Sequence, residues 1–125
     1  MENEDYEGAE KDFTIEIGKA RYVQKGDDVS IVTYGMGVHW ALDVLTDSEH
    51  ISADLIDLRT LVPLDKDTIF NSVKKTGRVI VLHEDCLTGG FGADIAALIS
   101  SSCFEYLDAP VKRSASIDTP VPFSN

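Results

Sequence analysis

The sequence has few cysteines, fewer basic than acidic residues, and no long apolar run. Its two cysteines, Cys86 and Cys103, lie 17 positions apart without a Cys-x-x-Cys pair, which argues against a disulfide framework or a zinc knuckle. We expect two reduced, mostly structural thiols. No segment is apolar over the length of a bilayer crossing, and no signal peptide opens the chain. We therefore expect a cytoplasmic protein, or an imported one whose targeting segment is absent from this sequence.

Acidic residues dominate the charge. The 125 residues include 11 basic and 22 acidic ones, for a net charge of -11. Nucleic acids and anionic membranes are polyanions, so neither is expected as a partner. A basic protein surface fits better, although acidity alone also serves solubility. The first 16 residues hold seven of the acids and one base. We expect residues 1–12 to form an acidic leader or linker and residues 13–125 to form one domain.

From Gly18 onward, strand-like and helix-like patterns alternate as in βαβ units. Asp65 is the predicted amino-terminal cap of the second helix and Gly77 its left-handed carboxyl-terminal cap. The pattern predicts a three-layer α/β/α sandwich on a mostly parallel five-stranded sheet. Strands are predicted over 19–24, 29–34, 53–58, 78–83 and 111–117, and helices over 38–48, from 63–65 to Gly77, and over 93–106.

In such sheets, ligand-facing residues gather where strands end at the carboxyl edge. The predicted ends are 34–35, 59–60 and 83–84, and they mark one functional edge. Asp57 and Arg59 lie on one face of a strand end, and we expect a structural salt bridge there.

Two glycine clusters precede predicted helices. Gly35-x-Gly37 resembles a dinucleotide fingerprint, but Trp40 stands where a third small residue is needed, and we expect its indole to obstruct helix–strand packing. We therefore interpret these glycines as a tight strand–helix turn. The second cluster, Gly89-Gly90-Phe91-Gly92, could cradle an anion. It lacks the P-loop pattern, and we favour a packing or interface role with Phe91 as the anchor.

His83 and Glu84 are adjacent in an extended chain, so their side chains should point to opposite faces and not act as one acid–base pair. Two roles for His83 remain open. It is either a general acid or substrate-facing hydrogen-bonding group, or a histidine satisfied by a backbone carbonyl at a subunit contact. No set of residues completes a metal site with His83-x-x-Cys86.

An ordered series of stretches resembles a known family. Together, from about Phe13 to Pro122, they resemble the beta subunit of the pyruvate and branched-chain 2-oxo acid dehydrogenases. The stretches are 28–35 (DVSIVTYG), 56–61 (IDLRTL), 63–65 (PLD), 72–78 (SVKKTGR), 83–84 (HE), 88–93 (TGGFGA), 107–111 (LDAPV) and 118–120 (DTP).

The resemblance implies a fold like the transketolase carboxy-terminal domain, with the first strand antiparallel. It implies that thiamine diphosphate and magnesium are held by other domains, one on an alpha subunit or alpha half of a fused chain and one upstream in the beta subunit. The complete enzyme decarboxylates a 2-oxo acid and passes the acyl group to lipoyl. By this resemblance the isolated chain binds no cofactor and is inactive.

The resemblance also implies roles for particular residues. His83, Glu84 and the stretch Thr88, Gly89, Gly90, Phe91 and Gly92 would face the assembled active-site mouth, with Tyr34 and Gly35 on the neighbouring loop. The domain would contact the alpha subunit and a second beta subunit, and would dock the basic subunit-binding domain of the acyltransferase component. The docking candidates are Asp94, Glu105 and Asp108.

Three other interpretations stay open at this point. The chain could be a free-standing nucleotide or small-molecule binder that uses the crevice between the Gly35 and Gly89 loops. It could be the carboxy-terminal domain of another transketolase-superfamily enzyme. It could also be a dimerisation module without a ligand.

Overall fold

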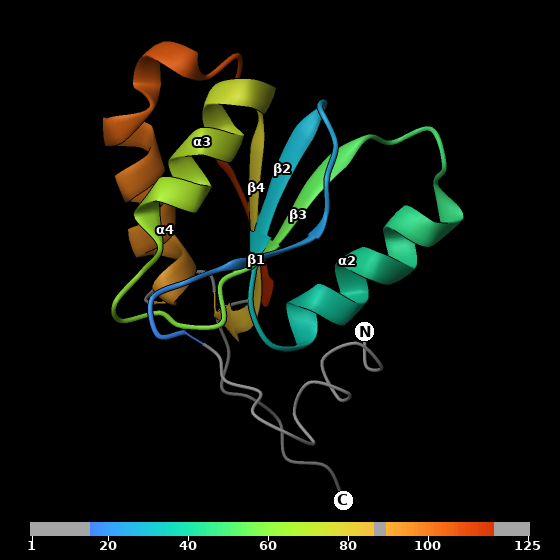
Figure 1. The fold of residues 1–125 in the computed structure, drawn as a ribbon, viewed down its shortest axis with the longest axis horizontal. Helices are drawn as coiled ribbons and strands as arrows, with labels where there is room; N and C mark the ends of the chain where they lie inside the picture. The colour runs from blue at the N-terminus through green and yellow to red at the C-terminus, as the bar shows by residue number, and fades with distance from the viewer. Residues whose placement is uncertain (1–15, 87–89, 117–125) are drawn as a thin grey trace, which may run out of the picture.

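The computed structural model describes residues 16–86 and 90–116 and contains a mixed sheet flanked by helices (Figure 1). The sheet order is β1-β3-β2-β4-β5, with β1 antiparallel to β3 and the other pairs parallel. The elements are β1 (Arg21–Gln24), β2 (Val29–Thr33), α2 (Met36–Asp47), β3 (Ala53–Asp57), α3 (Lys66–Thr76), β4 (Val79–Cys86), α4 (Phe91–Ser102), η1 (Phe104–Tyr106) and β5 (Lys112–Ser116).

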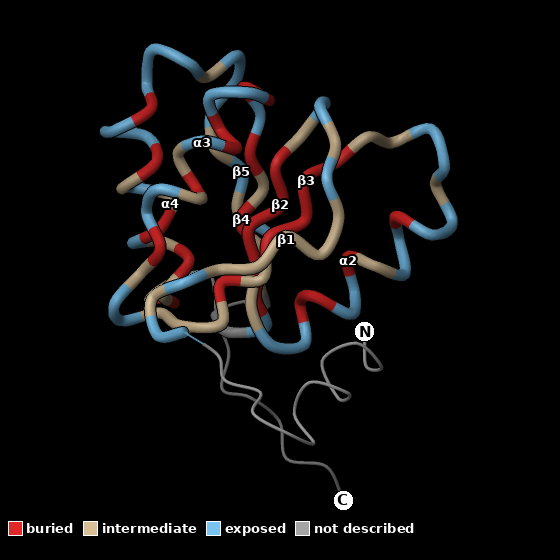
Figure 2. The backbone as a smooth tube through the Cα atoms, viewed as in Figure 1, coloured by how far each residue is buried: buried red, intermediate tan, exposed pale blue. Residues whose placement is uncertain are grey.

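The helices cover the two faces of the sheet unequally. In Figure 1, α3 and α4 lie together on one side of the sheet and α2 lies alone on the other. Two buried clusters match this division (Figure 2). The larger packs α3 and α4 on the sheet, and the smaller packs α2. The first contains Val32, Ile56, Leu58, Ile69, Val73, Val79, Val81, Ile95, Ile99 and Cys103, and the second Ile31, Ala41, Leu45, Ala53 and Leu55. The predicted three-layer sandwich is confirmed.

Helix α3 has the caps that its sequence predicts. The Asp65 carboxylate accepts a hydrogen bond from the Thr68 amide at 3.2 Å. Gly77 has a left-handed φ of 72°, and its amide donates to the Val73 carbonyl. Because these bonds satisfy backbone groups that a helix leaves free at its ends, α3 begins and ends as expected.

Two elements end three or more residues away from the predicted end. Strand β4 continues to Cys86, because β4 and β5 resume pairing at Cys86 and Ser116 after a register shift. His83 and Glu84 therefore lie inside the strand rather than at its end. Helix α4 ends at Ser102, and a 3₁₀ turn follows in which the Tyr106 amide donates to the Cys103 carbonyl at 2.9 Å.

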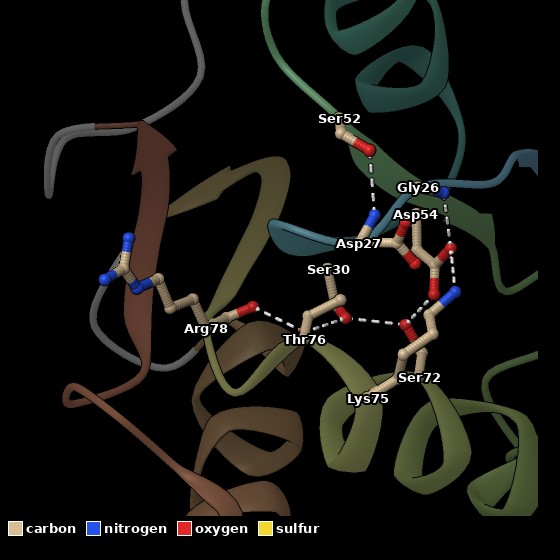
Figure 3. Close-up of polar contacts among 9 residues, drawn as sticks. All are labelled: Gly26, Asp27, Ser30, Ser52, Asp54, Ser72, Lys75, Thr76 and Arg78. Carbon is tan, nitrogen blue, oxygen red and sulfur yellow. Dashed lines mark hydrogen bonds and ion pairs between the residues drawn. The ribbon is translucent and has the colours of Figure 1, made fainter.

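A polar network ties β2, β3 and α3 together at the amino end of the sheet (Figure 3). The fully buried Asp54 carboxylate accepts from the Ser72 hydroxyl at 2.5 Å, Lys75 Nζ at 2.9 Å and the Gly26 amide at 2.9 Å. Ser30 Oγ lies 2.6 Å from Ser72 Oγ. Ser30 Oγ also lies 2.7 Å from Thr76 Oγ1. The side chains of Ser30, Asp54 and Ser72 are thus all hydrogen-bonded within the network.

The pKa of Asp54 reflects this arrangement. Burial opposes ionisation of the carboxylate, but the hydrogen bonds from Ser72, the Gly26 amide and Lys75 outweigh it and lower the pKa. The hydrogen bond to Asp54 in turn raises the pKa of Lys75. We therefore regard Asp54 as an ionised structural group.

Candidate functional site at the carboxyl edge

The carboxyl ends of β2 and β4 are neighbours in the sheet, and their following helices leave toward opposite faces. Strand β2 leads to α2 on one face, whereas α4 packs on the other face with Val79 and Val81. This is a topological switch point, the position where open α/β sheets form a crevice. The structure therefore brings the predicted 34–35 and 83–84 segments to one place.

His83 and Tyr34 meet at this switch point. Their rings stack with centroids 6.1 Å apart and an interplanar angle of 11°. The imidazole is only 1% exposed, and neither ring nitrogen has a hydrogen-bond partner within residues 16–86 and 90–116. Within the part of the chain that the structure describes, no backbone carbonyl satisfies His83. Both roles therefore stay open, a general acid or substrate-facing group and a histidine satisfied by a backbone carbonyl at a subunit contact. A buried polar group without a partner is uncommon and calls for a functional or structural explanation.

Gly92, in the first turn of α4, lies directly over the His83 ring. A Cβ atom at this position would collide with Nε2 and Cδ2 of the imidazole. Only glycine allows the helix to approach the strand so closely. The ring of His83 therefore links the turn after β2, through Tyr34, to the start of α4.

Glu84 points away from His83. It is exposed, whereas His83 is buried. The alternation of side chains along β4 accounts for this difference. The two side chains thus differ in burial, as the sequence predicts for adjacent residues of a strand.

The first glycine pair makes the tight turn that the sequence predicts. Gly35 has a φ of 59° and precedes α2. A Cβ atom on Gly37 would collide with Thr33 Oγ1, another buried polar atom without a partner. The expectation that Trp40 obstructs the packing is wrong. Gly37 makes the close approach, while the indole lies on the flank of α2 and is 42% exposed.

Asp57 stabilises the turn after β3 through the main chain. Its carboxylate accepts from the Arg59 amide at 3.1 Å. Arg59 has a φ of 59° and is the one non-glycine residue with positive φ among those described. Such a conformation is costly and is often found at functional sites. The structure thus places Asp57 and Arg59 at the same edge as Thr33, the register partner of Asp57.

The second glycine cluster is described only in part. Thr88 and Gly89 lie outside the described residues. Gly90 is the amino-terminal cap of α4 and offers no side chain to the helix. Phe91 is partly buried and packs against the larger core cluster of this domain. The predicted anchor residue therefore fixes the start of α4 to the domain's own core.

The three docking candidates lie in two places. Glu105 and Asp108 line an open groove of about 640 Å³ beside the end of α4, together with Phe104, Leu107 and Pro110. Phe104 is 76% exposed. Asp94 is exposed in the first turn of α4, at the helix's other end. Phe104 is not among the residues predicted from the sequence, although its position outside the inner stripe of Ile95, Ile99 and Cys103 indicates that it is exposed.

Two features are absent from residues 16–86 and 90–116. No group of three or more His, Cys, Asp or Glu side chains is placed to hold a metal ion within them. None of the helices in those same ranges is long and apolar enough to cross a membrane.

Comparison with known proteins gives consistent matches. Residues 18–125 match the family described as Transketolase, C-terminal domain. The pyruvate dehydrogenase E1 component subunit beta of Rickettsia bellii is 46% identical over 88% of this chain and 34% of the relative. That of Bacillus subtilis is 47% identical over 92% of this chain and 36% of the relative. The 2-oxoisovalerate dehydrogenase subunit beta of Dictyostelium discoideum is 45% identical over 89% of this chain and 31% of the relative.

A solved structure has the same fold. A split gene transketolase, described as an inactive beta4 tetramer, has a TM-score of 0.72 and 28% identity, covering 86% of this chain and 35% of that one. The chain spans about a third of the length of the curated relatives that it matches.

Proposed function

Because this chain belongs to the transketolase C-terminal domain family, we propose that it serves as that domain in the beta subunit of a 2-oxo acid dehydrogenase. One observation carries the proposal. Pyruvate and 2-oxoisovalerate dehydrogenase beta subunits match at 41–47% identity over 87–92% of the chain. In the complete enzyme, the domain contributes to assembly with an alpha subunit and a second beta subunit, in the cytoplasm.

In this proposal the carboxyl edge closes part of the active-site approach. The stacked Tyr34 and His83 rings, the Gly35 turn and the start of α4 lie together there. The ring nitrogens of His83 support this part of the proposal. They are buried without a hydrogen-bond partner among the described residues, and such burial lowers the stability of the domain. Glu84, Asp57 and Arg59 border the same edge, and residues 88–92 are the proposed loop of the active-site mouth.

Docking of the acyltransferase component is assigned to the opposite end of α4. The groove beside Phe104 combines an exposed aromatic ring with the carboxylates of Glu105 and Asp108. Aromatic anchors with charged neighbours are typical of protein interfaces, and acidic groups favour a basic partner. Asp94 lies too far along the helix to share this groove and is the weakest of the three candidates.

The cofactor belongs to other domains in this proposal. The described residues form no cluster of metal ligands, so we assign thiamine diphosphate and magnesium no site on this chain. Titration of the chain with both should release no heat, and the chain alone should not turn over a 2-oxo acid. Saturable binding in that titration would contradict this part of the proposal.

A chimera tests the function directly. This chain would replace the matching third of the Bacillus subtilis pyruvate dehydrogenase beta subunit, coexpressed with its alpha subunit. We expect the chimera to copurify with the alpha subunit and to decarboxylate pyruvate. The matched control carries Gly92→Val, which should disrupt the carboxyl edge. A folded chimera that does not bind the alpha subunit would overturn the proposal.

A further inference from the structure

Two exposed apolar side chains lie close together at the carboxyl edge of the sheet. Val62 is 81% exposed and Ile17 is 76% exposed. Val62 belongs to the loop that follows β3, and Ile17 lies in the turn that precedes β1. Because β1 is antiparallel to β3 and Arg21 pairs with Asp57, the start of β1 and the end of β3 meet at this edge. The loop and the turn are therefore neighbours (Figure 1).

Contacts between the two segments hold them together. Gly18 lies directly against Pro63, since a Cβ atom on this glycine would come within 3.2 Å of the proline Cγ. The Ala20 amide donates a hydrogen bond to the Asp65 carboxylate at 2.8 Å. Asp65 is also the amino-terminal cap of α3, so both segments are tied to the start of that helix. A partner that binds here would not have to order the backbone, and this lowers the cost of association.

The loop after β3 is apolar on two sides. Leu61 and Leu64 are partly buried and pack against the larger core cluster. Val62 and Pro63, which lie between them in the sequence, are exposed. We call Ile17, Val62 and Pro63 the apolar edge patch. The core needs only the inner side of the loop, and apolar groups that gather in solvent are typical of an interaction site.

Charge around the apolar edge patch is balanced, although the chain carries a net charge of -11. The exposed charged side chains of residues 16–21 and 59–67 are two acids and two bases, namely Glu16, Asp67, Lys19 and Lys66. The docking groove beside α4, by contrast, presents Glu105 and Asp108. A basic partner therefore has no electrostatic preference for the patch, and an apolar surface with little net charge fits it better.

The patch borders the candidate functional site. Strand β3 is the sheet neighbour of β2, and the end of β2 carries Tyr34, which stacks on His83. In the proposed function, this edge closes the approach to an active site whose cofactor the alpha subunit helps to hold. The alpha subunit is then the partner that reaches this edge, whereas the acyltransferase component binds at the other end of α4.

We propose that the apolar edge patch is the contact of this domain with the alpha subunit, through an apolar surface of that subunit that carries little net charge. The inference rests on the proposed function and adds to it the surface used in assembly. The contact would remove the side chains of Ile17 and Val62 from water, which favours association.

The chimera with the Bacillus subtilis beta subunit provides the test, because it is coexpressed with the alpha subunit. Val62→Glu and Ile17→Glu each place a charge in the contact, and each should reduce the amount of copurified alpha subunit by at least about tenfold. Val62→Ile keeps the side chain apolar and should retain the parent amount. Ala97→Glu adds the same charge at an exposed site on α4 and should also retain it.

Folding is checked on the 125-residue chain itself. Both side chains are exposed in it, so circular dichroism and the melting temperature of Val62→Glu and Ile17→Glu should match those of the parent chain. A lower melting temperature for both variants would show that the patch serves the stability of the domain, which contradicts the proposal.

The remaining outcomes separate this inference from the proposed function. Full copurification of the alpha subunit with both glutamate variants would overturn the inference and leave the proposed function intact. The same result with a lower melting temperature of the chimera would identify the preceding part of the beta subunit as the occupant. Full copurification with smaller assemblies in sedimentation would identify the second beta subunit. A parent chimera that does not bind the alpha subunit would refute the proposed function, and this inference with it.

Discussion

Buried polar side chains are hydrogen-bonded at one end of the parallel strands and lack such bonds at the other. At the amino end, Asp54 and Ser30 are fully buried and each has hydrogen-bond partners. At the carboxyl end, Thr33 and His83 are equally buried, but their side-chain polar atoms have no hydrogen-bond partner in the part of the chain that the structure describes. The difference indicates that the amino end is built for stability, whereas the carboxyl end keeps unfavourable groups that serve another purpose.

Two glycines allow the helices to pack closely on the carboxyl end of the strands. Gly37 lies over Thr33 and Gly92 lies over His83, and in both places a Cβ atom would overlap the side chain below. The start of each helix is thereby held against a polar side chain of a strand. The comparison predicts that replacing a buried polar side chain lowers stability at the amino end and raises it at the carboxyl end.

The largest effect is expected for Asp54→Ala at the amino end. The change leaves the Lys75 ammonium, the Ser72 hydroxyl and the Gly26 amide without their shared acceptor. The Lys75 side chain is 41% exposed and can be solvated by water, so the loss comes mainly from the Ser72 hydroxyl and the Gly26 amide. Leaving these donors without their acceptor should lower the free energy of unfolding by about 1–3 kcal/mol for each group. Urea denaturation measures this. Asp27→Ala, at an exposed neighbour, is the control and should change stability by less than about 0.5 kcal/mol.

Gly92→Ala should be next in size. The new methyl group would overlap the His83 ring, and overpacking of this kind costs about 1–3 kcal/mol. The double variant His83→Ala/Gly92→Ala removes the overlapping ring, so its loss should be smaller than the sum of the two single losses. Additive losses in thermal unfolding would show that the two residues do not press on each other.

His83→Leu should raise stability, in contrast to its counterpart Ser30→Ala. Leucine removes two buried nitrogens without partners and keeps an apolar side chain of similar size. The expected gain is about 1 kcal/mol. Ser30→Ala removes a hydroxyl that is hydrogen-bonded to Ser72 and Thr76 at the amino end. This change should lower the free energy of unfolding by about 1 kcal/mol. A loss for His83→Leu as large as that for Ser30→Ala would remove the distinction between the two ends.

The smallest expected effect is a change in how stability depends on acidic pH. The pKa of Asp54 is lowered in the folded chain, so the unfolded state binds protons more readily. Its contribution to stability is present above the unfolded pKa of about 3.9 and is lost as pH falls through the folded value. Urea midpoints measured between pH 6 and about 2.5 should therefore fall less steeply in Asp54→Ala than in the parent chain. Parallel curves would mean that Asp54 does not titrate differently on folding.

Local sequence signals were sufficient for the elements and for the turns. The caps of α3, the left-handed turn at Gly35 and the alternation of His83 and Glu84 depend on residues within a few positions of each other. The ordered motifs also identified the family without the structure. The same signals misplaced the end of β4, because that end is decided by pairing with β5 across a register shift.

Sequence by itself determined the α/β alternation, the helix caps and the family, since each depends on short-range periodicity or on motifs in order. Only the tertiary structure decided that His83 is buried without a hydrogen-bond partner among the described residues, and that Phe104 is exposed beside Glu105 and Asp108. The physical reason is that burial depends on which helix covers which half of the sheet. That arrangement is set by contacts between residues far apart in the chain.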